Sequence, residues 1–344
     1  MPSISQIIKN VAAVQMKTPT APFIIWGRPG EGKSDCCFQI ADNQNIRRER
    51  VTRLHLSQFD VVDLGGVPEI SEHAPTGERI TVFRPTAAFA AFAEGTGPGL
   101  IILEEVGQCA HDMQQFVACL IQDRATSTFK LDPEVRIVLT SNRVEDRSGV
   151  RPLLGLLNDR VYHQDMVTSL DDWCAWAMSH GRVDHLGIAF LRLRPDLLNA
   201  YDPEARSSPT QRSWTKLLTE VPRNLPAEDY LSIAAGKVGE GAAFEWVSAK
   251  DMMHKMPSMD AIRDEPTKVG VPDSAAVLFA VATALSTTAN ENTFSGDMQY
   301  VNRLKKEFQT VYVTDVLRLN PELPETETFI TWATENQKMF MGGN

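Results

Sequence analysis

The chain has 344 residues, of which 43% are hydrophobic and 23% are charged, and its formal net charge is −10. These are ordinary values for a globular chain long enough to bury a large core, so they exclude disorder as a description of the whole chain. An acidic chain is also a poor candidate for wrapping nucleic acid by charge alone. At about 150 residues per domain, the length favours two domains.

The first half of the chain alternates short apolar runs with helix-like stretches. We expect buried strands at 23–26, 51–56, 100–103 and 135–139, with helices at 34–42, 85–93 and 110–123 between them. Continuous apolar runs are typical of parallel strands that are covered on both faces. The pattern predicts an α/β domain with a parallel sheet over residues 1–165.

After about residue 165 the strand-like runs nearly vanish and helical patterns follow. We expect helices at 170–180, 183–192, 211–219, 226–235, 239–247, 274–288, 298–310 and 325–338. Prolines such as Pro203, Pro257 and Pro272 separate these patterns, as proline cannot continue a helix. Residues 166–344 are therefore expected to form an all-α domain.

The segment from residue 60 to residue 83 has a pattern of its own. Two short alternating runs flank residues 74–78, whose sequence Ala-Pro-Thr-Gly-Glu is rich in turn formers. Turn residues between alternating runs predict a β-hairpin, which we place near 60–83.

The strongest motif lies between the first apolar run and the first helix-like stretch. It fits the pattern G-x-x-x-x-G-K-[ST] at every fixed position and consists of Gly27, Arg28, Pro29, Gly30, Glu31, Gly32, Lys33 and Ser34. The glycines let backbone N–H groups converge on phosphate oxygens, and the start of the following helix favours the anion. Lys33 is expected to reach the β- and γ-phosphates and Ser34 to ligate Mg²⁺.

Two further apolar strands end in polar residues. The run at 100–103 ends in Glu104 and Glu105, as expected of a Walker B element. The first carboxylate would help to hold Mg²⁺, and the second would orient and deprotonate the attacking water. Glu104 stands where aspartate is usual. The run at 135–139 leads to Asn142, which could contact the γ-phosphate or the attacking water.

The order of these motifs resembles that of AAA+ ATPases. Residues 104–124, 140–146 and 156–161 look like the MoxR branch of that superfamily, and the hairpin segment resembles the helix-2 insert of its clade. The resemblance covers nearly the whole chain and is most specific over 23–165. It implies an αβα nucleotide-binding domain followed by a helical lid.

The resemblance also implies roles for single residues. Asn142 corresponds to sensor 1, and Arg160 is the leading candidate for an arginine finger, with Arg147 and Arg151 as alternatives in the same segment. Arg212, which precedes Trp214 by two residues, resembles the sensor-2 arginine. An arginine that acts on a neighbouring subunit would couple hydrolysis to ring assembly.

Together these features imply a Mg²⁺-dependent ATPase that works as a ring, with six subunits expected, and remodels a partner in a chaperone-like way. Members of this branch commonly act with a protein that carries a von Willebrand factor A domain. The Asp-x-Ser-x-Ser motif of such a domain is not in this sequence, so the partner would be a separate protein. ATP is favoured over GTP because no Asn-Lys-x-Asp element is present.

Composition bears on the compartment and on other ligands. Five cysteines without paired spacing are expected to be reduced thiols in a cytoplasmic protein, and the histidines show no spacing typical of structural zinc. No membrane-spanning segment is expected, because the longest apolar run has eleven residues (275–285). A signal peptide is not expected either, because the first residues lack a charged stretch followed by a long apolar run.

Two alternatives stay open. A nucleic-acid-directed AAA+ motor would share every nucleotide motif, although the acidic hairpin segment disfavours DNA at that position. An assembly protein that uses ATP as a structural ligand, with weak hydrolysis, would fit the unusual Glu104. Filaments or stacked rings would be compatible with that alternative.

Overall fold

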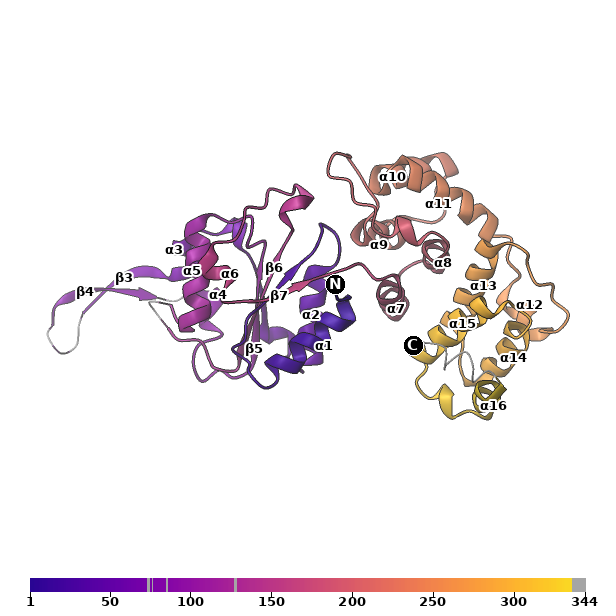
Figure 1. Ribbon diagram of the computed structural model, residues 1–344, viewed down its shortest axis with the longest axis horizontal. Coiled ribbons are helices and arrows are strands. Elements are labelled where there is room, and N and C mark those ends of the chain that lie inside the picture. The colour runs from indigo at the N-terminus through magenta and orange to yellow at the C-terminus, as the bar shows by residue number, and fades with distance from the viewer. Residues whose placement is uncertain (73–74, 76, 85, 127–128, 336–344) are drawn as a thin grey trace. The chain divides into compact units, whose positions relative to one another are not determined.

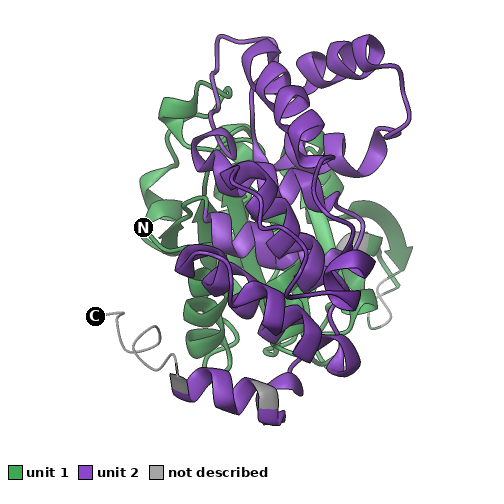
Figure 2. Cartoon of the chain, turned by 90° about the vertical axis from the view of Figure 1, so that its right-hand side faces the viewer, with its two compact units in different colours: residues 1–168 green, residues 169–344 purple. Residues whose placement is uncertain are grey.

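The computed structural model describes residues 1–72, 75, 77–84, 86–126 and 129–335 (Figure 1). The chain divides into two compact units, residues 1–168 and 169–344, which have different colours in Figure 2. Each unit is described by itself.

A parallel sheet of five strands forms the centre of the first unit, with the strand order β2-β5-β6-β1-β7. The strands are β1 (Phe23–Trp26), β2 (Val51–His55), β5 (Gly99–Glu104), β6 (Val135–Ser141) and β7 (Tyr162–Asp165). The four strands predicted from apolar runs are all present. Strand β7 was not predicted, because its sequence Tyr-His-Gln-Asp contains no apolar run and lies at the edge of the sheet beside β1.

Helices cover both faces of this sheet (Figure 1). Leu100 and Ile102 of β5 pack into a core shared with α1 (Ile4–Gln15) and α2 (Lys33–Asn43). Ile101 and Leu103 of the same strand point to the other face. That face is covered by α3 (Val61–Gly65), α4 (Ala87–Ala90), α5 (His111–Asp123) and α6 (Gly155–Asn158). The predicted α/β fold, a parallel sheet between two helical layers, is confirmed.

A two-stranded antiparallel ribbon lies where the hairpin was predicted. It consists of β3 (Val67–Glu72) and β4 (Arg79–Arg84), and it extends away from the sheet in Figure 1. Most of its side chains are exposed, including those of Ile70 and Phe83. Three residues of the predicted hairpin segment, 73, 74 and 76, lie outside the described residues.

One predicted helix of the first unit is shorter than expected, and one helix of this unit was not predicted. The helix expected at 85–93 is only α4, because Ala93 leaves the helix and forms a β-bridge with Leu131; residue 85 lies outside the described residues. Helix α1 was missed, although its apolar residues recur with helical spacing and Ser3 caps its first turn.

The described part of the second unit, residues 169–335, is helical and contains no strand. Its helices are α7 (Leu170–His180), α8 (His185–Leu193), α9 (Gln211–Glu220), α10 (Ala227–Val238), α11 (Glu240–Met253), α12 (Met259–Asp264), α13 (Ala275–Thr288), α14 (Glu291–Val301), α15 (Lys306–Leu319) and α16 (Glu327–Glu335). Helix α13 contributes to two cores, one with α7–α11 and one with α12 and α14–α16. The all-α character of this region is confirmed.

The single helix predicted at 298–310 is instead the end of α14 and the start of α15. The joint is stabilised by Gln309, whose Nε2 donates to the carbonyl oxygens of Asn302 at 3.2 Å and Leu304 at 2.8 Å. A side chain from the next helix thus satisfies carbonyls that a continuous helix would have bonded internally. The helix predicted at 325–338 begins at Glu327, and residues 336–338 lie outside the described part.

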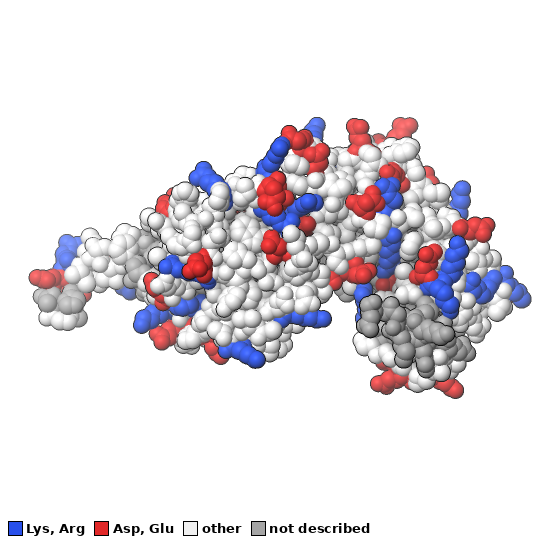
Figure 3. Space-filling model, viewed as in Figure 1, with Lys and Arg blue, Asp and Glu red and all other residues white. Residues whose placement is uncertain are grey.

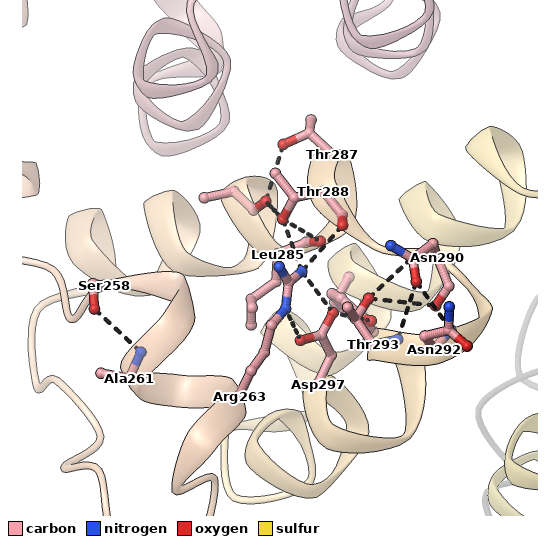
Figure 4. A network of polar contacts seen from close by, with 12 residues as sticks. Ser258, Ala261, Arg263, Leu285, Thr287, Thr288, Asn290, Asn292, Thr293 and Asp297 are labelled. Carbon is pink, nitrogen blue, oxygen red and sulfur yellow. Dashed lines mark hydrogen bonds and ion pairs between the residues drawn. The ribbon is translucent and has the colours of Figure 1, made fainter.

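Buried ion pairs connect the helices of the second unit. Arg192 on α8 bonds Asp315 on α15 at 2.6 Å and Thr283 on α13 at 2.8 Å. Arg263 on α12 bonds Asp297 on α14 at 2.9 Å, and its guanidinium also reaches Thr288 at the end of α13 (Figure 4). Arg192 therefore joins three helices around the buried carboxylate of Asp315. Arg263 joins two helices and the end of a third around the buried carboxylate of Asp297.

Charged side chains of both signs lie on the surface. On the face shown in Figure 3, acidic and basic side chains are interspersed over both units. Within the described ranges, no helix has both the length and the apolar character needed to cross a bilayer.

Candidate functional site

The predicted site residues of the first unit gather at one edge of the sheet. Strand β1 leads into Gly27, β6 leads into Asn142, and β5 ends at Glu104. Because β6 lies between β1 and β5 and all three run parallel, their carboxyl ends meet at the same edge. This is the edge at which open α/β sheets bind ligands.

Glycines shape the loop between β1 and α2. Gly30 and Gly32 have φ values of 81° and 88°, a region that other residues rarely adopt, and Gly32 is the residue before the first turn of α2. A Cβ on Gly27 would lie 2.8 Å from Glu31 Oε2. The loop therefore depends on its glycines for both backbone conformation and close packing, and it leads directly into a helix N-terminus that favours an anion.

Lys33 lies over this loop and touches the neighbouring strand end. Its Nζ donates to the carbonyl oxygens of Gly27 at 2.8 Å and Arg28 at 2.9 Å, and to Asn142 Oδ1 at 2.6 Å. Residues 109 positions apart in the sequence are thus brought into direct contact. The Lys33 ammonium group and the Asn142 amide, which were both predicted to contact the γ-phosphate, therefore lie next to each other.

The loop is braced from within by an acidic side chain. Glu31 is buried; its Oε2 accepts the Arg28 N–H at 2.6 Å and its Oε1 accepts the Thr168 hydroxyl at 3.0 Å. Arg28 Nε in turn lies 3.7 Å from the buried carboxylate of Asp146. Sequence reasoning placed Arg28 and Glu31 in the loop but did not reveal that Glu31 faces inward.

Glu104 lies on the face of the sheet that α2 covers. Its side chain is 3% exposed, and Oε2 lies 3.0 Å from His55 Nδ1. Oε1 is buried and has no hydrogen-bond partner among the residues that the structure describes. Burial raises the pKa of the Cys37 thiol, and the charges of Cys36 and Glu104 raise it further. Cys37 is three residues after Ser34 on α2, so it shares a helix face with Ser34. Glu104 thus shares a face of the sheet with α2, the helix that begins with Lys33 and Ser34.

Glu105 occupies the bend where β5 ends. Its φ is 61°, in the left-handed region, and its Oε2 accepts a hydrogen bond from Ser57 Oγ at 3.0 Å. The next residue, Val106, donates its N–H to the Thr140 carbonyl at 3.1 Å, which fixes the bend against β6. A non-glycine residue with positive φ is uncommon and occurs often at functional sites.

These residues fit a divalent cation. The hydroxyl of Ser34 and the carboxylate of Glu104 are the oxygen donors that Mg²⁺ prefers. The buried, unpartnered Oε1 of Glu104 is an acceptor that a bound cation would satisfy, and it is the observation that supports such a site.

The candidate arginines are placed differently. Arg160 Nη1 donates to the carbonyl of Ala118 on α5 at 2.9 Å. Arg147 has a φ of 50°, and Arg151 is exposed. Arg212 is exposed at the second position of α9, in the other unit. Nothing in the placement of these four arginines identifies a finger or a sensor, so their roles stay predictions.

Sequence reasoning missed three polar side chains of strand β2 and the residues after it. Arg53 and His55 contact Glu104, and Ser57 contacts Glu105. The strand itself was predicted, but its register against β5 was not, and only the register places these side chains beside the two glutamates.

No protein-family model matches the chain, and no curated protein matches it in sequence. Among solved structures, it is similar to RuvB from Thermotoga maritima, with 12% identity, 86% of this chain and 89% of that chain covered, and a TM-score of 0.41. NtrX from Brucella abortus has 14% identity, coverage of 91% and 66%, and a TM-score of 0.36.

A DNA polymerase III gamma subunit-related protein from Thermotoga maritima has 8% identity, coverage of 91% and 83%, and a TM-score of 0.32. Scores this low carry no information on what this chain binds. The case for its ligand rests on its own fold and side chains.

Proposed function

We propose that this chain is a Mg²⁺-dependent ATPase of the AAA+ type. The observation that carries the proposal is the contact between Lys33 and Asn142 above a loop of the sequence G-x-x-x-x-G-K-S, at the carboxyl edge of a parallel sheet. A lysine held by loop carbonyls can exchange them for phosphate oxygens, which are stronger acceptors because they are charged.

Hydrolysis would use in-line attack of water on the γ-phosphate. The loop N–H groups and the α2 N-terminus bind the phosphates, and Lys33 contacts their β- and γ-oxygens. Ser34 and Glu104 would hold Mg²⁺, which neutralises charge on these oxygens. Glu105 accepts the proton of the attacking water, and Asn142 orients that water or the γ-phosphate.

The arginines would complete the site in an assembly. Arg160 would give up the Ala118 carbonyl for the nucleotide of a neighbouring subunit, with Arg147 and Arg151 as the alternatives. Arg212 would contact the phosphates of its own subunit. A homo-oligomeric ring, hexameric in our proposal, follows from this division of roles.

In that ring the β3–β4 ribbon would contact the protein to be remodelled. Its exposed Ile70 and Phe83 give it apolar groups for such a contact. A MoxR-like role, with a separate partner carrying a von Willebrand factor A domain, is the form of this activity that the sequence favours. A cytoplasmic location fits that role.

One observation favours a second candidate. The guanidinium of Arg53 lies 3.8 Å from Glu104 Oε2, so a positive charge already stands beside the carboxylate that would help to hold Mg²⁺. Slow turnover with tight ATP binding would then make ATP a structural ligand between subunits.

The test is steady-state turnover of Mg-ATP by the purified chain over a range of protein concentrations, beside Glu105→Gln. Loss of the general base is expected to lower turnover by about 100-fold or more while ATP binding persists. Glu49→Gln, which changes an exposed glutamate of the same unit, is the matched control and should keep full activity. Unchanged turnover in Glu105→Gln would contradict the assigned chemistry, and ATP binding without turnover in the unmutated chain would favour the second candidate.

A further inference from the structure

Strand β2 ends beside Glu104 in two basic side chains that the mechanism above does not use. His55 Nδ1 lies 3.0 Å from Glu104 Oε2, and Arg53 Nε lies 3.8 Å from the same oxygen. The strand register explains the contact, because His55 stands directly opposite Glu104 in the β2–β5 pair. Arg53 is two residues earlier and therefore points to the same face.

The two oxygens of Glu104 consequently have different surroundings. Both contacts go to Oε2, whereas Oε1 is buried and accepts no hydrogen bond from the described part of the chain. A carboxylate oxygen accepts and cannot donate, so this contact is a hydrogen bond when His55 Nδ1 carries the hydrogen. With Oε2 held from β2, the oxygen left for a cation is Oε1.

This arrangement matters because glutamate has one more rotatable bond than the usual aspartate. An unsupported glutamate loses more side-chain freedom when it is fixed in a single orientation. Here His55 is attached to the neighbouring strand of the sheet, and it limits the orientations that the Glu104 carboxylate can adopt. Arg53, whose side chain is 45% exposed, gives weaker support from a longer distance.

We propose that His55, supported by Arg53, is a positioning residue that orients Glu104 so that Oε1 faces the divalent cation of the bound nucleotide. The inference rests on the proposed function, since it requires a cation at this site. His55 would act only through Glu104, as the hydrogen-bond partners of metal ligands do in other proteins.

The test measures cation binding separately from turnover. The full chain is saturated with a non-hydrolysable ATP analogue, and the dissociation constant of Mn²⁺ is read from its electron paramagnetic resonance signal. His55→Ala is expected to raise this constant by about tenfold. The affinity for the analogue in EDTA should not change, because His55 does not touch the nucleotide.

Two further variants separate positioning from folding. His55→Asn keeps a side-chain N–H donor near the place of Nδ1 and should restore most of the Mn²⁺ affinity. His111→Ala removes an exposed imidazole at the start of α5 and should match the unmutated chain. If His55→Ala weakened binding of the analogue equally in EDTA, the side chain would have a general structural role and the proposal would be overturned.

Glu104→Asp gives the sharpest version of the test, because the shorter side chain cannot keep the contact with His55. In that background, His55→Ala should change the Mn²⁺ constant by less than about twofold, as expected when two residues act through one interaction. A tenfold effect in both backgrounds would contradict the proposal.

The outcome also shows which proposal fails. If the unmutated chain binds the analogue equally well with and without Mn²⁺, or does not bind it, the proposed function is wrong and this inference falls with it. If binding depends on Mn²⁺ and His55→Ala behaves as the unmutated chain does, only the positioning role is overturned.

Discussion

Buried charge is arranged differently in the two units. In the helical unit, Arg192 pairs with Asp315 and Arg263 pairs with Asp297, and both aspartates are buried. In the sheet unit, Glu104 is just as buried. Asp315 Oδ2 and Glu104 Oε1 both lack a hydrogen bond from any described residue, but Asp315 Oδ2 lies 2.6 Å from Arg192 Nη2, whereas the two basic neighbours of Glu104 contact its other oxygen.

This difference distinguishes a buried carboxylate that stabilises the fold from one that can bind a ligand. The helical pairs lie where several helices cross, and they join elements that are far apart in the sequence. Glu104 lies at the end of a strand, beside a phosphate-type loop, where a cation can complete its surroundings. A buried carboxylate therefore indicates a ligand site only when its neighbours leave one oxygen unsatisfied at the carboxyl edge of the sheet.

The largest effect on stability is expected from breaking a helical pair. Asp315→Ala leaves the buried Arg192 guanidinium without its carboxylate, which typically costs about 3–5 kcal/mol of the free energy of unfolding. Five of the six tryptophans lie within 169–344, so urea unfolding followed by tryptophan fluorescence reports this unit. Glu265→Gln, at an exposed pair, is the control and should have little effect. An equally small effect of Asp315→Ala would remove the contrast between the units.

The pH dependence should differ in sign between two buried aspartates. Burial alone would raise the pKa of Asp132, but N–H groups of Glu134, Gly97 and Gly95, with Arg50, lower it below its ordinary value. Asp132 thus stabilises the sheet unit above its unfolded-state pKa of about 3.9, and this contribution is lost as the pH falls through the lower folded-state pKa. Asp132→Asn should reduce this loss of stability at low pH, as measured by hydrogen exchange of the backbone amides of residues 95–104.

Asp297 should behave in the opposite way. Burial raises its pKa despite the opposing hydrogen bond from Arg263. Its contribution to stability therefore increases as the pH falls from the raised folded-state pKa towards the unfolded value. Asp297→Asn should remove that increase in urea unfolding at several pH values. Slopes of the same sign for Asp132 and Asp297 would contradict the assigned causes.

The smallest effect is expected on the β3–β4 ribbon. Arg84 Nε and Glu69 Oε2 are 2.5 Å apart, but both side chains are more than half exposed. Exposed pairs of this kind contribute less than about 1 kcal/mol, so Arg84→Ala should leave the urea midpoint nearly unchanged. A marked loss of stability would show that this exposed ion pair stabilises the ribbon, which would contradict the prediction.

Much of the fold could be predicted because its signals are local. The four apolar strands, the loop from Gly27 to Ser34 and the helical nature of the second half each depend on neighbouring residues. Strand β7 could not be predicted in this way, because its stability comes from pairing with β1 and not from its own polar sequence. The break near Asn302 was missed for the same reason, since the side chain that satisfies it belongs to the next helix.

The sequence by itself determined which chemical groups are present and which strand ends carry them. The motifs specified Lys33, Glu104, Glu105 and Asn142 without any knowledge of their distances. Only the tertiary structure decided which groups meet: Lys33 with Asn142, His55 with Glu104, and Arg192 with Asp315. The reason is that propensity and motif spacing act over a few residues, whereas strand register and helix packing join residues that are tens of positions apart.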